Sequence, residues 1–194
     1  MADPIAITGG PSDAELLRLV YTDDLTGLYN RRFFSKYLKQ DSDWSEGAPP
    51  IALCIMDLDY LKRINDHPRL GHLAGDAVLR RIGQVLRDGA GEGNLPVRYA
   101  GDEFALILPN RTREEGMAAG ERLRKAIQED PFSDANLPDG LHPSLSVGVA
   151  LFPEDAKTGD ELVDRAAKAL YYSKRTGKNR VTSAAAIAGR AEVA

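Results

Sequence analysis

Residues 98–104, with the sequence RYAGDEF, combine two adjacent acids with small neighbours. Asp102 and Glu103 follow Ala100 and Gly101, and apolar runs of β-type residues lie on both sides. This pattern predicts a β-hairpin over about 96–109 whose turn carries both carboxylates. Small residues in the turn would let a phosphate group or a ligand come close to the backbone. The alternative is an ordinary solvated turn, because short motifs often match by chance.

A further acid stands upstream of the hairpin. Residues 51–56 are apolar, which predicts a buried strand, and Asp57 follows at its carboxyl end, where open α/β sheets place their ligand sites. Asp57, Asp102 and Glu103 would then gather around the turn. Carboxylates so close repel one another and raise each other's pKa, and a bound divalent cation removes this repulsion. We therefore expect a two-metal phosphoryl-transfer site, with a salt-bridged acidic surface as the alternative.

Other segments make the chain similar to a known family. Residues 24–32 read DLTGLYNRR, residues 57–66 read DLDYLKRIND and residues 71–76 read GHLAGD. A last group stands near the carboxyl end: Ala169, Leu170, Tyr171, Lys174, Gly177, Asn179 and Arg180. In type, spacing and order these segments resemble the motifs of the GGDEF family, the bacterial diguanylate cyclases, with Ala100 in place of the first signature glycine. The resemblance covers about residues 19–181, and several motifs in register are more specific than any one alone.

The resemblance implies a fold and an activity. The fold is an α/β sandwich, a mixed central sheet flanked by helices, with the palm-like architecture of nucleotide cyclases. The activity is condensation of two GTP molecules into cyclic di-GMP with release of pyrophosphate, in a transient antiparallel homodimer. The implied cofactor is Mg²⁺ or Mn²⁺, two ions per active site. The alternative function is a weak or non-catalytic module that binds GTP or a protein; the intact acids favour the enzyme.

The resemblance also implies roles for single residues. The metal ligands are Asp57, the carbonyl group of Leu58, Asp102 and Glu103. One of the two hairpin acids would help to deprotonate the attacking 3′-hydroxyl, and the sequence leaves open which of them does so. The candidate phosphate contacts are Lys62, Lys174 and Lys178, with an ordinary solvated surface charge as the alternative for a lysine. Tyr60 and Leu61 are further residues implied to bind the substrate. Lys174 matches the family's phosphate-binding lysine and is counted with the catalytic residues, whereas Lys178 replaces the usual arginine and loses its bidentate fork.

Asn65 and Asp76 match the residues that read the guanine edge in the family. An amide and a carboxylate suit the N–H donors of guanine, and a site built for those donors should reject adenine. The alternative role for both residues is helix capping.

The chain departs from the family pattern at two further places. Residues 67–70, HPRL, are longer than the usual connection and lie beside the implied guanine pocket. The Arg-x-x-Asp motif of the family's product-inhibition site is also missing, because residues 91–94 read GEGN. We therefore expect little inhibition by cyclic di-GMP at this position.

The elements that must position these residues follow from periodicity and capping signals. We expect a leader with a short helix capped by Asp13 over 1–20, the catalytic domain over 21–183, and a disordered tail over 184–194. The predicted strands cover about 51–57, 96–109, 145–152 and 179–182. A first predicted helix covers about 30–38, a short one from about Tyr60 carries Lys62 and Asn65, and a longer one follows with apolar residues from Leu73 to Leu86 on one face. Thr112 is expected to cap a helix over about 113–129, and Thr158 or Asp160 to open a helix that runs to about Arg175. A turn lies at 23–29, and we expect Arg31 and Arg32 to tie it to the core domain or to a partner.

Composition excludes several classes of protein. The chain has 194 residues and a net charge of −4, so its overall charge does not favour nucleic acid or an anionic membrane. No apolar stretch is long enough to predict a membrane span, and the single cysteine, Cys54, lies within an apolar strand and predicts a buried thiol. These features favour a cytoplasmic protein.

Overall fold

The centre of the sheet is formed by two long antiparallel strands, β1 (Ile51–Asp59) and β4 (Ser144–Phe152). The computed structural model describes residues 12–138 and 140–189. Every residue of β4, and every residue of β1 except the half-buried Asp57, is buried. Both faces of these strands are therefore covered, which explains why residues 51–56 and 147–152 are continuously apolar instead of alternating with polar residues.

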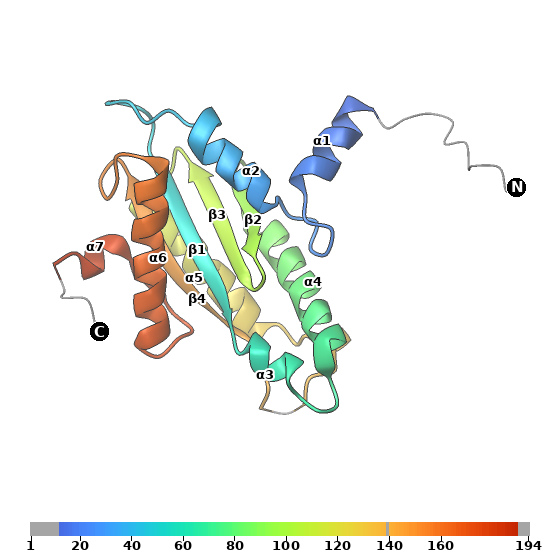
Figure 1. The fold of residues 1–194 in the computed structure, drawn as a ribbon. Coiled ribbons are helices and arrows are strands. Elements are labelled where there is room, and N and C mark those ends of the chain that lie inside the picture. The colour runs from blue at the N-terminus through green and yellow to red at the C-terminus, as the bar shows by residue number, and fades with distance from the viewer. Residues whose placement is uncertain (1–11, 139, 190–194) are drawn as a thin grey trace, which may run out of the picture.

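Three further strands complete a mixed sheet in the order β2-β3-β1-β4-β5 (Figure 1). Strands β2 (Leu95–Ala100) and β3 (Glu103–Pro109) form the predicted hairpin, and β3 pairs with β1. Strand β5 (Val181–Ser183) is parallel to β4. The predicted mixed sheet is confirmed.

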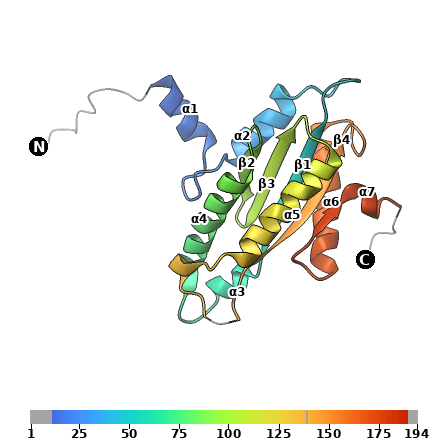
Figure 2. The same cartoon turned by 180° about the vertical axis from the view of Figure 1, so that it is seen from behind.

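Helices cover both faces of the sheet. Helices α4 (Gly71–Gly89) and α5 (Arg113–Glu129) lie on one face, as Figure 2 shows, and α2 (Arg31–Lys36) and α6 (Gly159–Arg175) lie on the other. Alternate residues of β1 accordingly face two cores: Cys54 packs with the α4 and α5 side, and Leu53 with the α2 and α6 side. The predicted α/β sandwich and the buried Cys54 are thus confirmed.

Helix α6 approaches β4 very closely at Gly148. A Cβ atom at Gly148 would lie 2.1 Å from the carbonyl oxygen of Ala166 and 2.2 Å from the backbone nitrogen of Leu170. Only glycine therefore allows this backbone-to-backbone packing.

Shorter elements connect these layers. They are α1 (Asp13–Tyr21), a π-helical turn (Tyr37–Asp41) that continues α2, α3 (Leu61–Asn65), a 3₁₀ turn η2 (Ser133–Ala135) and α7 (Ala184–Ile187). Over the described ranges 12–138 and 140–189, no helix combines the length and apolar character needed to cross a bilayer.

Both ends of the chain differ in part from the prediction. Ser12, not Asp13, caps α1, because Ser12 and Glu15 form a reciprocal capping box. The predicted disordered tail begins instead with helix α7: the Ser183 hydroxyl accepts a hydrogen bond from the Ala186 nitrogen, and Ala184 is buried. The rest of the predicted leader, residues 1–11, and residues 190–194 of the tail lie outside the described residues.

Candidate active site

The acids of the hairpin meet Asp57 at one end of the sheet. Asp57 pairs directly with Glu103 in the β1–β3 register, and the Leu58 nitrogen donates a 3.0 Å hydrogen bond to the Asp102 carbonyl oxygen. Among the described residues, no three acidic, histidine or cysteine side chains are grouped closely enough to hold a metal ion by themselves. Any ion here would need oxygen ligands beyond these side chains.

Lys174 supplies positive charge to this acidic end. It lies in the last turn of α6, forms an ion pair and hydrogen bond with Asp57, and its Nζ lies 3.4 Å from the Asp59 carboxylate. Burial raises the pKa of Asp57, the hydrogen bond and charge of Lys174 lower it, and the charges of Asp102 and Asp59 raise it again, so that it stands above its ordinary value. The lysine that the resemblance implies to bind phosphate is therefore paired with a carboxylate in this structure.

Asp59 is a residue of the site that the sequence analysis did not single out. Its carboxylate is fully buried and accepts hydrogen bonds from Ser144 at 2.8 Å, from Ser146 at 3.0 Å and from the Asn179 backbone nitrogen at 3.1 Å. Asp57 and Asp59 are two residues apart on β1, so both face the same side of the sheet, and this period-two spacing was the available signal. Asp59 ties β1, β4 and the loop after α6 together.

Most of the other residues implied to bind the substrate lie around the start of α3. Tyr60 has a left-handed backbone, with φ of 71°, and the Lys178 ammonium lies 4.4 Å from the centroid of its ring. Lys62 is exposed on α3, whereas Leu61 is 6% exposed and packs in the core. The side chain of Leu61 is therefore structural, and only its backbone could meet a ligand.

Asn65 and Asp76 lie on the adjoining helices α3 and α4. The Asn65 amide oxygen is buried and finds no hydrogen-bond partner among the residues that the structure describes. A Cβ atom at Gly75 would lie 1.9 Å from this oxygen, so the amide packs directly against the Gly75 backbone. In the described part of the chain neither residue caps a helix start, since Tyr60 and Leu70 hold the N-cap positions of α3 and α4. The capping alternative is therefore wrong.

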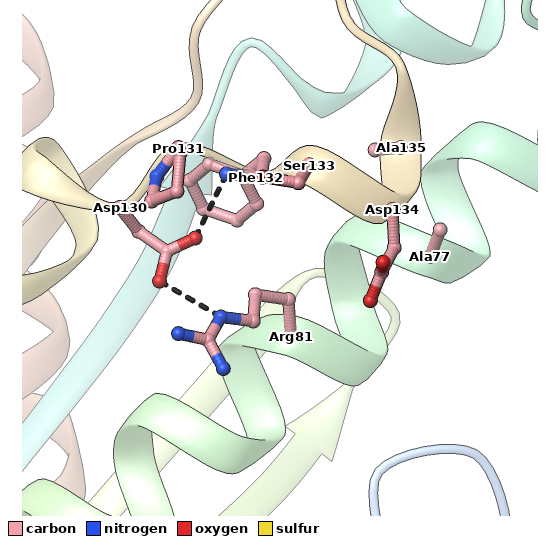
Figure 3. A pocket seen from close by; sticks show the side chains of 8 residues that line it. All are labelled: Ala77, Arg81, Asp130, Pro131, Phe132, Ser133, Asp134 and Ala135. Carbon is pink, nitrogen blue, oxygen red and sulfur yellow. Dashed lines mark hydrogen bonds and ion pairs between the residues drawn. The ribbon is translucent and has the colours of Figure 1, made fainter.

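Two cavities lie outside this site. The smaller cavity, of about 120 Å³, lies between α4 and η2 (Figure 3). There the Arg81 guanidinium pairs with Asp130 at 2.8 Å, and Asp130 also accepts a 2.9 Å hydrogen bond from the Phe132 nitrogen. These contacts anchor the segment that leads towards β4.

The larger cavity, of about 550 Å³, is a groove between α1 and the domain, and its lining includes Leu17, Tyr21, Phe33, Arg87, Gly91 and Asn94. Gly91 and Asn94 are the ends of the segment where the product-inhibition motif is missing.

Comparison with known proteins identifies the family. The sequence profile described as "Diguanylate cyclase, GGDEF domain" matches residues 20–180. The response regulator PleD of Caulobacter vibrioides is 34% identical over 171 residues, which are 88% of this chain and 37% of PleD. Diguanylate cyclase A of Treponema denticola is 32% identical over 177 residues, 88% of this chain and 46% of that protein.

A solved structure agrees with these relatives. The coiled coil and GGDEF domain of DgcB from Caulobacter crescentus, in complex with c-di-GMP, superposes with a TM-score of 0.76 at 30% identity and covers 88% of each chain. The chain spans less than half the length of the two curated relatives, so the comparison concerns their GGDEF domains. On the profile match and these relatives, the chain belongs to the GGDEF family.

Proposed function

We propose that this domain is a diguanylate cyclase that condenses two GTP molecules into cyclic di-GMP and releases pyrophosphate. The observation that supports this proposal is the course of β1 into α3. The strand brings Asp57 opposite Glu103 and then continues into the helix that carries Asn65. A group for phosphate chemistry and a group for base recognition thus lie on one continuous stretch of chain.

The donor set at the acidic end suits Mg²⁺ or Mn²⁺. It offers hard oxygens from Asp57, the Leu58 carbonyl group, Asp102 and Glu103. Mg²⁺ usually takes only one or two carboxylates and completes its shell with substrate phosphates and water, so the lack of a preformed side-chain cluster in the described residues fits this ion. Two bound ions would stabilise the charge that develops on the attacking and leaving oxygens.

The protein's own groups would orient the nucleotide. Asp76 would accept hydrogen bonds from the guanine N–H groups, and the Asn65 amide would pair with the same edge of the base. Lys174, Lys178 and Lys62 would neutralise the triphosphate, and Asp102 or Glu103 would accept the proton of the 3′-hydroxyl. Adenine lacks the matching donors and should be rejected.

One chain offers one guanine site and one acidic turn, whereas the product joins two nucleotides. We therefore propose that two copies meet in antiparallel orientation, each with one GTP, so that each 3′-hydroxyl reaches the α-phosphate of the other nucleotide. Because the substrate GTP is a nucleotide of the cytoplasm, we place this activity there.

The test is incubation of the chain with GTP and Mg²⁺, followed by nucleotide chromatography. We expect cyclic di-GMP and pyrophosphate from GTP and no product from ATP. Asp102→Asn and Glu103→Gln should each lower turnover by about 100-fold or more, as the loss of a ligand or general base does. The matched control is Asp134→Asn, an exposed acid on η2. Full activity in both hairpin variants would disprove the assignment, and GTP binding without turnover would favour the non-catalytic module.

A further inference from the structure

The ring of Tyr60 lies near two cations at the end of the sheet that carries the acids. The Lys178 Nζ is 4.4 Å from the ring centroid, and the Arg63 guanidinium carbon is 5.6 Å from it. Both distances are within the range in which the negative face of an aromatic ring attracts a cation. The tyrosine is 38% exposed, so the ring is not simply a buried core residue.

The backbone around both partners is held in unusual conformations. Tyr60 has φ of 71°, Lys178 has φ of 62° and Asn179 has φ of 45°, all in the left-handed region that costs energy for residues other than glycine. Such conformations persist where surrounding contacts enforce them.

Asn179 fixes the position of its neighbour Lys178. The backbone nitrogen of Asn179 donates to the buried Asp59, and its side-chain oxygen accepts a 2.8 Å hydrogen bond from Arg124. The loop after α6 is therefore tied to β1 and α5, and Figure 1 shows α3 and the end of α6 at the same end of the sheet. These bonds hold the backbone beside Lys178 but do not involve its side chain.

We propose that Tyr60 is a positioning residue, whose ring holds the Lys178 ammonium beside the site for the nucleotide phosphates. This inference rests on the proposed function. A lysine is a flexible point charge without the planar fork of arginine, and it loses much side-chain freedom when it is fixed on a phosphate. The ring reduces that loss because it confines the ammonium before the nucleotide arrives, so that Tyr60 assists GTP binding through Lys178.

The experiment measures binding apart from turnover. The ligand is 3′-deoxy-GTP with Mg²⁺, which lacks the attacking hydroxyl and cannot react. Calorimetry compares the wild-type chain with Tyr60→Leu, Tyr60→Phe, Lys178→Met and the double variant Tyr60→Leu/Lys178→Met. Tyr60→Leu keeps apolar bulk but removes the ring face, and we expect the Kd to rise by about 2- to 5-fold, the size of an exposed cation–π contact. Tyr60→Phe keeps the ring face and should rescue most of that loss.

The double variant separates positioning from a general effect of the substitution. If Tyr60 acts through Lys178, adding Tyr60→Leu to Lys178→Met should leave the Kd unchanged. The proton signals of the Lys178 side chain in the ligand-free chain should also lose a ring-current shift in Tyr60→Leu and keep it in Tyr60→Phe.

Additive losses in the double variant would overturn the inference, as would unaltered binding in Tyr60→Leu. In either case the proposed function would stand, provided that the wild-type chain binds the analogue. Failure of the wild-type chain to bind it would overturn the proposed function and this inference together.

Discussion

Gly75 controls the position of Asn65, and this leads to a prediction at the scale of single residues. In Gly75→Ala the new methyl group would fall 1.9 Å from the Asn65 amide oxygen, so the amide must rotate away. We expect the affinity for 3′-deoxy-GTP to fall by about 10-fold or more, since a guanine-facing group is lost. Stability should change little, because the obstacle is the end of a flexible side chain and alanine favours the helix by about 1 kcal/mol.

Titration calorimetry and thermal unfolding check this prediction. The double variant Gly75→Ala/Asn65→Ala is the control. If Gly75→Ala acts only by displacing Asn65, the double variant should bind no more weakly than Asn65→Ala. Unimpaired binding in Gly75→Ala would show that the amide does not read the base.

At this scale the sequence predicts where the acidic residues lie better than which groups they contact. The positions of Asp57, Asp102 and Glu103 at one end of the sheet follow from the strand pattern and are confirmed. The Lys174–Asp57 ion pair does not follow from it, because 117 residues separate the partners and no local rule pairs them. Asp59 was missed for a similar reason, since its serine partners on β4 stand 85 and 87 residues further along the chain.

The turn before α2 gives a prediction at the scale of elements. Asp23 accepts hydrogen bonds from the Thr26 nitrogen and hydroxyl and forms an ion pair with Arg98 at 3.1 Å, while Arg87 donates to the Thr26 carbonyl oxygen. Arg87 and Arg98 thus hold this turn through its backbone and its acid. Arg31 does contact the domain, since its guanidinium carbon lies 5.2 Å from the ring centroid of Tyr99 on β2, whereas the bonds to the turn itself come from α4 and β2.

We expect Asp23→Asn to lower the free energy of unfolding by about 1–2 kcal/mol at pH 7, as the loss of charged hydrogen bonds does. Burial alone would raise the pKa of Asp23, but the bonds from Thr26 and Arg98 outweigh it and hold the pKa below the ordinary value of 3.8. A lowered pKa in the folded state stabilises the fold above pH 3.8, and this contribution is lost as the pH falls through the folded-state pKa.

Denaturant unfolding at a series of pH values provides the measurement. The difference between wild type and Asp23→Asn should shrink once the pH drops below 3.8. The neighbouring exposed Asp24, changed to Asn, is the matched control and should show no such dependence. A difference that stays constant down to pH 2 would contradict the role of the Asp23 charge.

Elements with strong local signals were predicted closely. Thr112 caps α5 as expected, and α6 begins after Thr158. The ends of the chain were predicted less well, because a single buried alanine and a serine cap are weak signals for helix α7. Strand order could not be derived from local pattern either, since β1 joins the sheet between two strands that follow it in sequence.

At the scale of the whole molecule, the proposed meeting of two copies predicts how activity depends on protein concentration. Helix α1 is the only described helix before the domain, it has nine residues, and none of the residues Asp13–Tyr21 is buried. A helix of this length is too short to hold a stable coiled coil by itself. Specific cyclase activity should therefore rise with protein concentration. A flat specific activity down to nanomolar protein would instead indicate a tight dimer formed before substrate binds.

Inhibition by cyclic di-GMP, the product of the proposed reaction, is a second property at the scale of the whole molecule. Gly91 has no charged side chain, and the side-chain nitrogen of Asn94 donates a 2.8 Å hydrogen bond to the Ala90 carbonyl oxygen. Arginine and aspartate would be needed there to grip phosphate and guanine. We expect no submicromolar binding of cyclic di-GMP at this segment and little non-competitive inhibition. Calorimetry on nucleotide-free Asn65→Ala without metal is the check, because tight binding in that variant would reveal another inhibitory site.

The close approach of α6 to β4 at Gly148 affects how mutational screens of this domain should be interpreted. Any side chain at position 148 would meet the α6 backbone within about 2 Å and push away the helix that carries Lys174. Substitutions there would abolish activity as completely as substitutions at Asp102, although Gly148 lies in the buried interior of β4. A screen scored by cyclase output alone would therefore misclassify a packing position as part of the catalytic machinery, and a parallel screen for folded protein abundance would correct the error.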